Sequence, residues 1–254
     1  RRQRQMCIRD RIYTYNLNEG IGETCMIDAE KFEKIKKEHP FFSITELIYL
    51  FLREEIIHLH LPPKQKLNES RIASSLAISR TPVRKALDQL LEEFLVEKNG
   101  KLYTVSSMSK SESLMLCEAR IAIEGHAVFL ATSNINPSQL KRLEELTVTY
   151  EQVNLEDGSW EYAECDHDFH NLLIEAAENL HISQMYETME LRLRHYRHCL
   201  ISEIGKEQLR PILDKSARNH RAILNAIKLG FADQAKALIE KDIKGMYEVF
   251  FEWR

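Results

Sequence analysis

Residues 67–105 read LNESRIASSLAISRTPVRKALDQLLEEFLVEKNGKLYTV, and this stretch decides the fold of the N-terminal part of the chain. Asn68 can cap a helix over 69–77, because its side chain can accept from the first free backbone N–H groups. Ser79 can cap a second helix over 80–93 after a short break. Two helices joined so closely predict a helix-turn-helix.

A β-hairpin is predicted directly after these helices. Two β-rich segments, 94–97 and 102–106, are joined by Asn99-Gly100, and Asn-Gly between strands is a strong hairpin signal. A further helix is expected before them at 43–61, where apolar residues recur at helical spacing until Pro62-Pro63. Three helices followed by a hairpin predict a winged helix-turn-helix domain over 41–108.

The second helix of the pair begins with residues suited to an anionic partner. Arg80 and Arg84 lie four positions apart, so they share a face and can grip phosphate or read guanine edges. Ser79 and Thr81 offer hydroxyls to phosphate oxygens. The chain has a net charge of -4, yet 70–87 contains basic residues and no acidic one. A solvated helix face is the alternative, but the position before a hairpin favours DNA binding.

The rest of the chain, 109–254, reads as helices separated by short breaks, which predicts an all-α antiparallel bundle of about six helices. The fold class is therefore mainly α. The expected helices span 110–133, 137–153, 159–178, 181–203, 206–229 and 232–252, with breaks that include Glu156-Asp157-Gly158, Gly205 and Gly230.

Composition limits the class of protein. The 254 residues are 44% hydrophobic and 29% charged, and no apolar run approaches the ~18 residues of a membrane span. The five cysteines are scattered without a CxxC pair, which favours a reducing, cytoplasmic location. Residues 1–40 are expected to be an extension. Its MCIRDR string resembles translated sequencing-adapter sequence, so 1–12, or the whole stretch to 25, is expected to be non-native.

These motifs resemble the GntR family of bacterial transcription factors, through the winged-helix signature at 67–105 and its SRTPVRKAL core. The helical remainder resembles the FCD ligand domain of the FadR subfamily. The residues that carry this second resemblance are the Arg120–Glu124 run, the DxxFH at Asp166–His170, Asn179, the HRAILNAI at 220–227 and the QAKALIEKDI that follows.

The resemblance implies a homodimeric repressor or activator on a palindromic DNA operator. Arg80, Thr81 and Arg84 match the positions that contact DNA, Ser70 matches a weaker contact, and Gly100 matches the wing tip. Three positions depart from the family, which has glycine where this chain has Lys64, Ala77 and Phe94.

The resemblance also implies a divalent metal inside the helical bundle. Asp166, His170 and His220 match its ligands, and Asp242 stands where the family has a fourth histidine. Carboxylate and imidazole together suit Zn, Mn or Ni. Arg120 would face the cavity and pair with a small organic acid as effector. The alternative is a degenerate pocket in which Asp242 only forms hydrogen bonds or ion pairs.

A metal-dependent enzyme on the helical bundle is the competing function, since a metal with open positions can support hydrolysis. The chain contains no HExxH, no GxSxG and no phosphate-binding loop. An enzyme would also have no use for SRTPVRKAL. The sequence therefore predicts a ligand-responsive regulator and no enzymatic activity, and it leaves open the operator, the effector and the sign of regulation.

Overall fold

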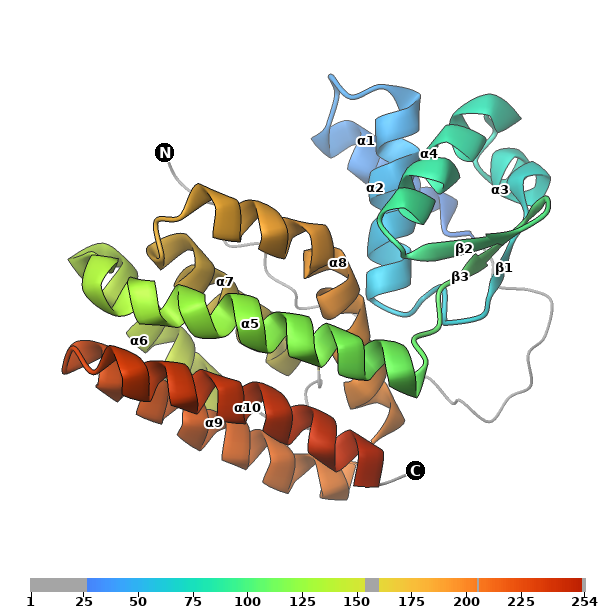
Figure 1. Cartoon of the computed structure of the whole chain (residues 1–254). Helices are drawn as coiled ribbons and strands as arrows, with labels where there is room; N and C mark the ends of the chain where they lie inside the picture. The colour runs from blue at the N-terminus through green and yellow to red at the C-terminus, as the bar shows by residue number, and fades with distance from the viewer. Residues whose placement is uncertain (1–26, 154–159, 205, 253–254) are drawn as a thin grey trace.

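The computed structural model describes residues 27–153, 160–204 and 206–252. Figure 1 shows a small N-terminal domain beside a larger bundle of long helices. The prediction of a mainly helical protein with these two parts is confirmed. The suspected foreign segment and the predicted breaks at Glu156-Asp157-Gly158 and Gly205 lie outside the described residues.

The small domain is a winged helix-turn-helix, as predicted. Its helices and strands are α1 (Ala29–Glu38), α2 (Ile44–Ile57), β1 (Lys66–Leu67), α3 (Glu69–Ser75), α4 (Arg80–Glu92), β2 (Val96–Asn99) and β3 (Leu102–Val105). The hairpin β2–β3 forms at the expected Asn-Gly, and β1 pairs antiparallel with β3 to give the sheet order β1-β3-β2. The sequence predicted the hairpin but not β1.

Helix α1 is a second element that the sequence did not predict, because it lies within the expected extension. Phe32 of α1 is buried and meets the ring of Phe51 on α2 edge-on, with ring centroids 5.7 Å apart. Lys31 of α1 also forms an ion pair with Glu55 of α2. Apolar burial and an ion pair therefore join α1 to the domain, although it precedes the predicted boundary at residue 41.

The three departures from the family's glycines occupy backbone conformations that favour glycine. Lys64 has a φ of 69°, Ala77 of 53° and Phe94 of 60°. A side chain in this left-handed region costs roughly 1–2 kcal/mol per residue. The backbone at these three positions therefore adopts the left-handed conformation that glycine favours, although each residue carries a side chain.

The bundle consists of six helices whose ends lie within two residues of the predicted ones. They are α5 (Lys110–Asn134), α6 (Pro137–Gln152), α7 (Trp160–Ala176), α8 (Leu180–Glu203), α9 (Lys206–Lys228) and α10 (Ala232–Glu252). Ser109 with Glu112 caps α5, and Asn136 with Gln139 caps α6, which fixes where both helices begin.

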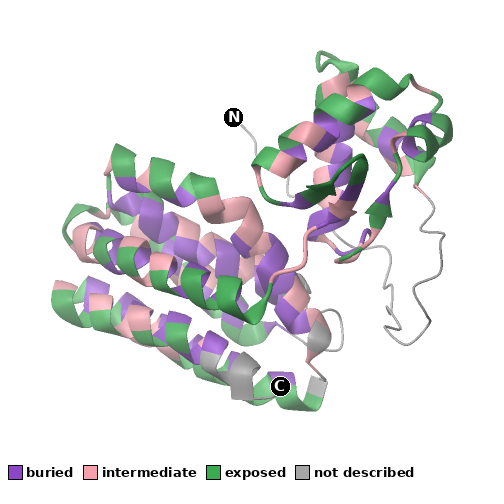
Figure 2. Ribbon diagram, turned by 45° about the vertical axis from the view of Figure 1, so that its right-hand side comes forward, coloured by how far each residue is buried: buried purple, intermediate pink, exposed green. Residues whose placement is uncertain are grey.

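Helices α5 and α10 lie side by side along the bundle, with α9 next to α10 (Figure 1). Their inward faces are buried and their outward faces exposed (Figure 2). Among the described residues, no helix is long and apolar enough to cross a membrane. The bundle core is thus built from the apolar stripes of amphipathic helices.

Helix α8 also packs against α2 and so connects the two domains. Arg192 lies over the ring of Phe94 at 4.9 Å, and Arg194 lies 3.8 Å from Glu54. The exposed Phe94 of the wing region is therefore partly covered by a side chain of the bundle.

Candidate functional site

Three helices bring the predicted metal ligands to one point inside the bundle. Asp166 and His170 lie four residues apart on α7 and so share a face. His220 on α9 and Asp242 on α10 lie on either side of the turn at Gly230, whose φ is 74°. All four side chains are buried. The sequence spacing and the fold therefore assemble the set that was predicted.

The ligand atoms are spaced as a metal site requires. His170 Nε2 lies 3.7 Å from Asp166 Oδ1 and from Asp242 Oδ2, and His220 Nε2 lies 3.5 Å from each of the same two oxygens. Two ligands at about 2.0–2.2 Å from one zinc ion are about 3.0–3.6 Å apart, depending on the angle. One ion would thus fit among these four atoms.

His220 gives the clearest sign that the residues fit a metal. Its ring is fully buried and stacks on Phe169 with centroids 3.9 Å apart. Neither ring nitrogen has a hydrogen-bond partner among the described residues. Nε2 instead faces Asp166 Oδ1 and Asp242 Oδ2, each at 3.5 Å, which is too long for a hydrogen bond. A metal ion between these atoms would bind all three directly.

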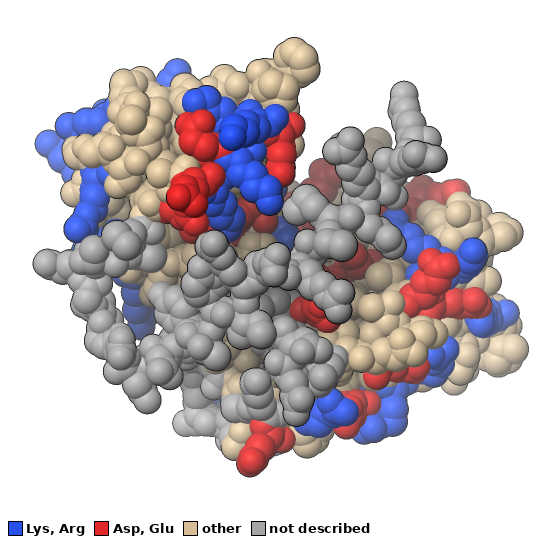
Figure 3. All heavy atoms as spheres, turned by 180° about the vertical axis from the view of Figure 1, so that it is seen from behind, with Lys and Arg blue, Asp and Glu red and all other residues tan. Residues whose placement is uncertain are grey.

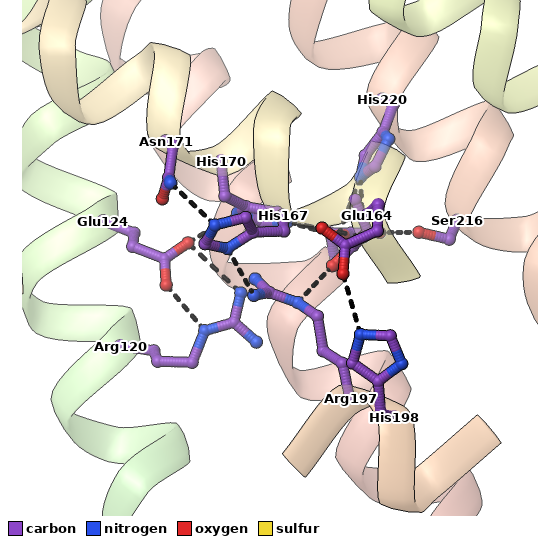
Figure 4. Close-up of polar contacts among 12 residues, drawn as sticks. Arg120, Glu124, Glu164, His167, His170, Asn171, Arg197, His198, Ser216 and His220 are labelled. Atoms are coloured by element: carbon purple, nitrogen blue, oxygen red, sulfur yellow. Dashed lines mark hydrogen bonds and ion pairs between the residues drawn. The ribbon is translucent and has the colours of Figure 1, made fainter. Parts of the chain in front are cut away.

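Outer contacts orient the ligands. Glu124 of α5 places Oε2 2.5 Å from His170 Nδ1, which leaves Nε2 facing the other ligands (Figure 4). Asp242 Oδ1 accepts hydrogen bonds from Ser216 Oγ at 3.1 Å and Asn219 Nδ2 at 2.9 Å. Such partners fix the orientation of metal ligands. Glu124 was not predicted, although it lies four residues after Arg120.

The electrostatics of the pocket favour ionised carboxylates. Burial alone would raise the pKa of Asp166, but the charges of Arg197 and His170 hold that pKa well below its ordinary value. Contacts with His170 and His220 lower the pKa of Asp242 in the same way, against the effect of burial. Burial opposes protonation of His220, yet the two carboxylates raise its pKa to about 9. The carboxylates thus attract a positive charge to this point.

Two arginines line the same pocket. Arg120, the predicted effector contact, donates from Nε to Glu124 Oε1 at 2.6 Å and is buried. Arg197 of α8, which was not predicted, pairs through Nε with Asp166 Oδ2 at 2.6 Å (Figure 4). The free volume is about 20 Å³, room for about one water molecule. An ion fits directly, whereas an organic acid requires side chains to move.

The predicted DNA-contacting side chains lie at the start of α4. Arg80, Thr81 and Arg84 are exposed. Arg84 donates to Glu69 of α3 from Nη2 at 2.8 Å, and Arg80 lies 3.4 Å from the same oxygen. Viewed from behind, lysines and arginines lie along the outer edge of the small domain (Figure 3). A carboxylate thus holds both arginines in the DNA-free protein.

The remaining predicted contacts lie near α4. Ser79 occupies the N-cap position, but its side chain makes no capping hydrogen bond, so that part of the prediction is wrong. Ser70 belongs to the first turn of α3, where Asn68 caps the helix. Gly100 lies in the β2–β3 turn with a φ of 60° and nothing within 4 Å of an added Cβ, so the wing tip is open.

Comparisons with known families match both domains. The model of the family described as "Bacterial regulatory proteins, gntR family" matches residues 44–101, and the FCD domain matches residues 115–245. The chain is 25% identical over 207 residues to an uncharacterized HTH-type transcriptional regulator of Bacillus subtilis, YdhC, covering 80% of this chain and 88% of that protein.

Other relatives agree with these matches. A probable D-xylose utilization operon transcriptional repressor of Paenarthrobacter nicotinovorans is 27% identical, over 76% of this chain and 83% of that one. Among solved structures, Escherichia coli McbR/YncC superposes with a TM-score of 0.69 at 22% identity, covering 84% of this chain and 99% of that chain. This last likeness shows the shared fold alone.

Proposed function

The chain belongs to the gntR family of bacterial regulatory proteins and carries its FCD domain, and from this premise we propose that it binds a palindromic operator as a homodimer and responds to a small carboxylate at a metal-containing pocket. As a member of that family it is a transcriptional regulator and not an enzyme, so the enzyme hypothesis is wrong. Relatives that are named as repressors support the proposal that this protein represses transcription. We place its action in the cytoplasm, with the DNA.

Exposed arginines at the start of α4 support the DNA-binding part of the proposal. The N-terminal turns of a recognition helix point into the major groove, where guanidinium groups bind phosphate or guanine. Arg80, Thr81 and Arg84 take this role, with Ser79 and Ser70 toward the backbone and Gly100 at the wing tip. On binding, phosphate or base oxygens replace Glu69 as the partner of Arg84.

One observation supports the proposal that the bundle binds a metal and an effector. It is the set of candidate ligands formed by Asp166, His170, His220 and Asp242. Four buried ligand atoms lie 3.5–3.7 Å apart around one point, and both nitrogens of the central His220 lack a hydrogen-bond partner among described residues. Two carboxylates and two imidazoles suit Mn, Zn or Ni, and the second carboxylate makes the set harder than one with three histidines.

The effector follows from the charges around the metal ligands. Arg120 and Arg197 are buried cations, and guanidinium groups pair bidentately with carboxylates. Because the free volume is small, side chains must move to admit an organic acid, and we propose that Arg197 leaves Asp166 to pair with it. The acid would then complete the coordination of the metal and pair with the arginines. Metal binding thus supplies a Lewis acid that holds a carboxylate in the pocket.

The DNA-binding proposal is tested by fluorescence anisotropy with a fragment of the gene's own promoter region. Arg84→Ala is expected to weaken specific binding about 5–150-fold, because one bidentate base contact is worth about 1–3 kcal/mol. Lys85→Ala is the matched control, since this exposed neighbour loses the same charge. Equal affinities of the two variants would contradict the assignment of Arg84.

The metal proposal is tested by elemental analysis of protein equilibrated with Mn, Zn or Ni and then dialysed. His220→Ala is expected to lower the metal content by one ion per chain. His181→Ala, a change at an exposed histidine on α8, is expected to leave the content unchanged. If His220→Ala retains the full content, Asp242 serves only in hydrogen bonds and the pocket is degenerate.

A further inference from the structure

A second group of metal-binding side chains lies where the small domain meets the bundle. His58 follows the last turn of α2, Glu164 lies on α7 and His198 lies on α8. Each offers a ligand atom, and the three atoms lie within 4.8 Å of one another. The group therefore joins three helices and two domains.

This group is separate from the buried pocket. Glu164 and Asp166 are two positions apart on α7, about 200° around the helix axis, so their side chains leave the helix in nearly opposite directions. Asp166 takes part in the buried ligand set, whereas Glu164 contacts Arg194 and His198 (Figure 4 shows the contact with His198). An ion at one point would share no ligand with an ion at the other.

The ligand atoms lie close enough for one ion to reach them after small shifts. His198 Nε2 and Glu164 Oε1 form a hydrogen bond of 2.9 Å, and they would separate by about 0.5 Å to become two ligands of a tetrahedral zinc ion. The rings of His58 and His198 meet edge-on, with centroids 5.2 Å apart and planes at 70°. Imidazoles crossed in this way can direct a nitrogen of each ring toward one point.

Neighbouring side chains hold the three groups in place. Arg194 donates to both oxygens of Glu164, at 3.0 Å from Nε and from Nη2. A carboxylate has about four lone-pair sites, so Oε1 can accept from Arg194 and still bind a cation. Glu54 Oε2 lies 3.3 Å from His58 Nε2, and a carboxylate beside a histidine is a usual outer contact of a metal ligand.

The three side chains of the cluster differ in their exposure to solvent. The side chain of His198 is fully buried, whereas those of Glu164 and His58 are 29% and 30% exposed. Two of the three side chains are therefore in contact with solvent, from which an ion can reach them.

We infer that His58, Glu164 and His198 form a second divalent-metal site, able to hold zinc, that fastens the DNA-binding domain to the effector-binding bundle. Two imidazoles and one carboxylate with an open fourth position form a zinc ligand set. Zinc at this point fixes α2 relative to α7 and α8, and so limits the orientation of α4 on DNA. The site goes beyond the proposed function and does not depend on the buried pocket.

The test is the zinc content of the full-length protein, measured by elemental analysis after dialysis against micromolar zinc. His58→Ala is expected to lose one zinc ion per chain relative to the unchanged protein. His181→Ala is the matched control and is expected to lose none. Because His58 lies at a helix end and is partly exposed, its replacement is expected to leave the fold intact, as far-UV circular dichroism would verify.

A second measurement tests the link between the domains. Zinc is expected to slow amide hydrogen exchange at residues 54–58 in the unchanged protein but not in His58→Ala, since only the intact site ties the end of α2 to the bundle. A metal bound by the bundle alone would leave exchange at these residues unchanged.

The inference is overturned if His58→Ala and the unchanged protein hold the same number of zinc ions, because the cluster is then only a hydrogen-bonded domain contact. This outcome is distinct from failure of the buried site, which appears as an unchanged metal content in His220→Ala. The two variants therefore report on the two sites independently.

Discussion

His170 Nδ1 lies 2.5 Å from Glu124 Oε2, and both side chains are almost fully buried. Helix α5, which lies beside the four candidate ligands, thus supplies the carboxylate that orients the imidazole of His170. The same carboxylate pairs with Arg120, so the proposed metal ligand His170 and the proposed effector contact Arg120 are connected through one residue.

Replacement of this carboxylate should weaken metal binding without removing a ligand. Glu124→Gln is expected to lower the affinity for Mn or Ni by 10–100-fold, the usual effect of losing an outer partner. Isothermal titration calorimetry checks the affinity. Glu118→Gln is the control, because Glu118 is exposed on the same helix. Equal affinities of both variants would show that the His170–Glu124 contact does not support metal binding.

Removal of only one member of the Arg120–Glu124 ion pair should lower the free energy of unfolding. Arg120→Met leaves the Glu124 charge buried without its main partner, which is expected to lower the free energy of unfolding by about 3–5 kcal/mol. Urea denaturation in metal-free buffer measures this loss. The double variant Arg120→Met/Glu124→Leu should lose less, because the buried Glu124 charge is absent and the remaining cost is the lost contact with His170 Nδ1. A double variant as unstable as the single one would argue against this explanation.

Release of the recognition arginines should strengthen DNA binding. Glu69→Gln removes the carboxylate that holds Arg80 and Arg84, so both can neutralise phosphates, and affinity for DNA is expected to rise several-fold with a steeper salt dependence. Glu92→Gln, an exposed charge change on α4, controls for net charge. Weaker binding by Glu69→Gln would instead mean that Glu69 positions Arg84 for DNA.

Glycine should stabilise the turn between α3 and α4. Ala77 has a φ of 53°, and Ala77→Gly is expected to raise the free energy of unfolding by about 1 kcal/mol through relief of that strain. Ala73→Gly, inside α3, should lower it by at least ~0.5–1 kcal/mol, because glycine weakens a helix. Thermal denaturation of both variants measures whether the two changes in the free energy of unfolding have opposite signs. A destabilised Ala77→Gly would show that the lost methyl contacts exceed the strain.

The sequence predicted the elements whose local signals were strong. The helix expected over 43–61 forms as α2, where Ser43 and Glu46 make a capping box, and the Asn-Gly pair lies at the turn of β2–β3. The two-residue strand β1 was missed because it is too short to show an alternating pattern. Its pairing with β3 depends on contacts across 36 residues or more of sequence, which no local signal encodes.

The four metal-ligand candidates could be predicted because they match the ligand positions that the family resemblance implies, and the four-residue spacing of Asp166 and His170 on one helix face agrees with that pattern. The outer contacts could not. Arg197 lies in a run with His195 and His198 that shows no ligand spacing, and only the packing of α8 on α7 brings it to Asp166. Glu124 offered one signal, its position four residues after Arg120, but that spacing does not identify His170 as its second partner.

Arg194, Arg197 and His198 lie within about one turn of α8, yet they face different parts of the molecule. Arg197 reaches Asp166 in the pocket, while Arg194 reaches Glu54 of the DNA-binding domain. A shift of this turn that carried Arg197 away from Asp166 would carry the backbone of Arg194 with it, because the two residues are less than one helical turn apart. The shortest covalent path between the buried pocket and Glu54 of the DNA-binding domain is therefore a single turn of α8.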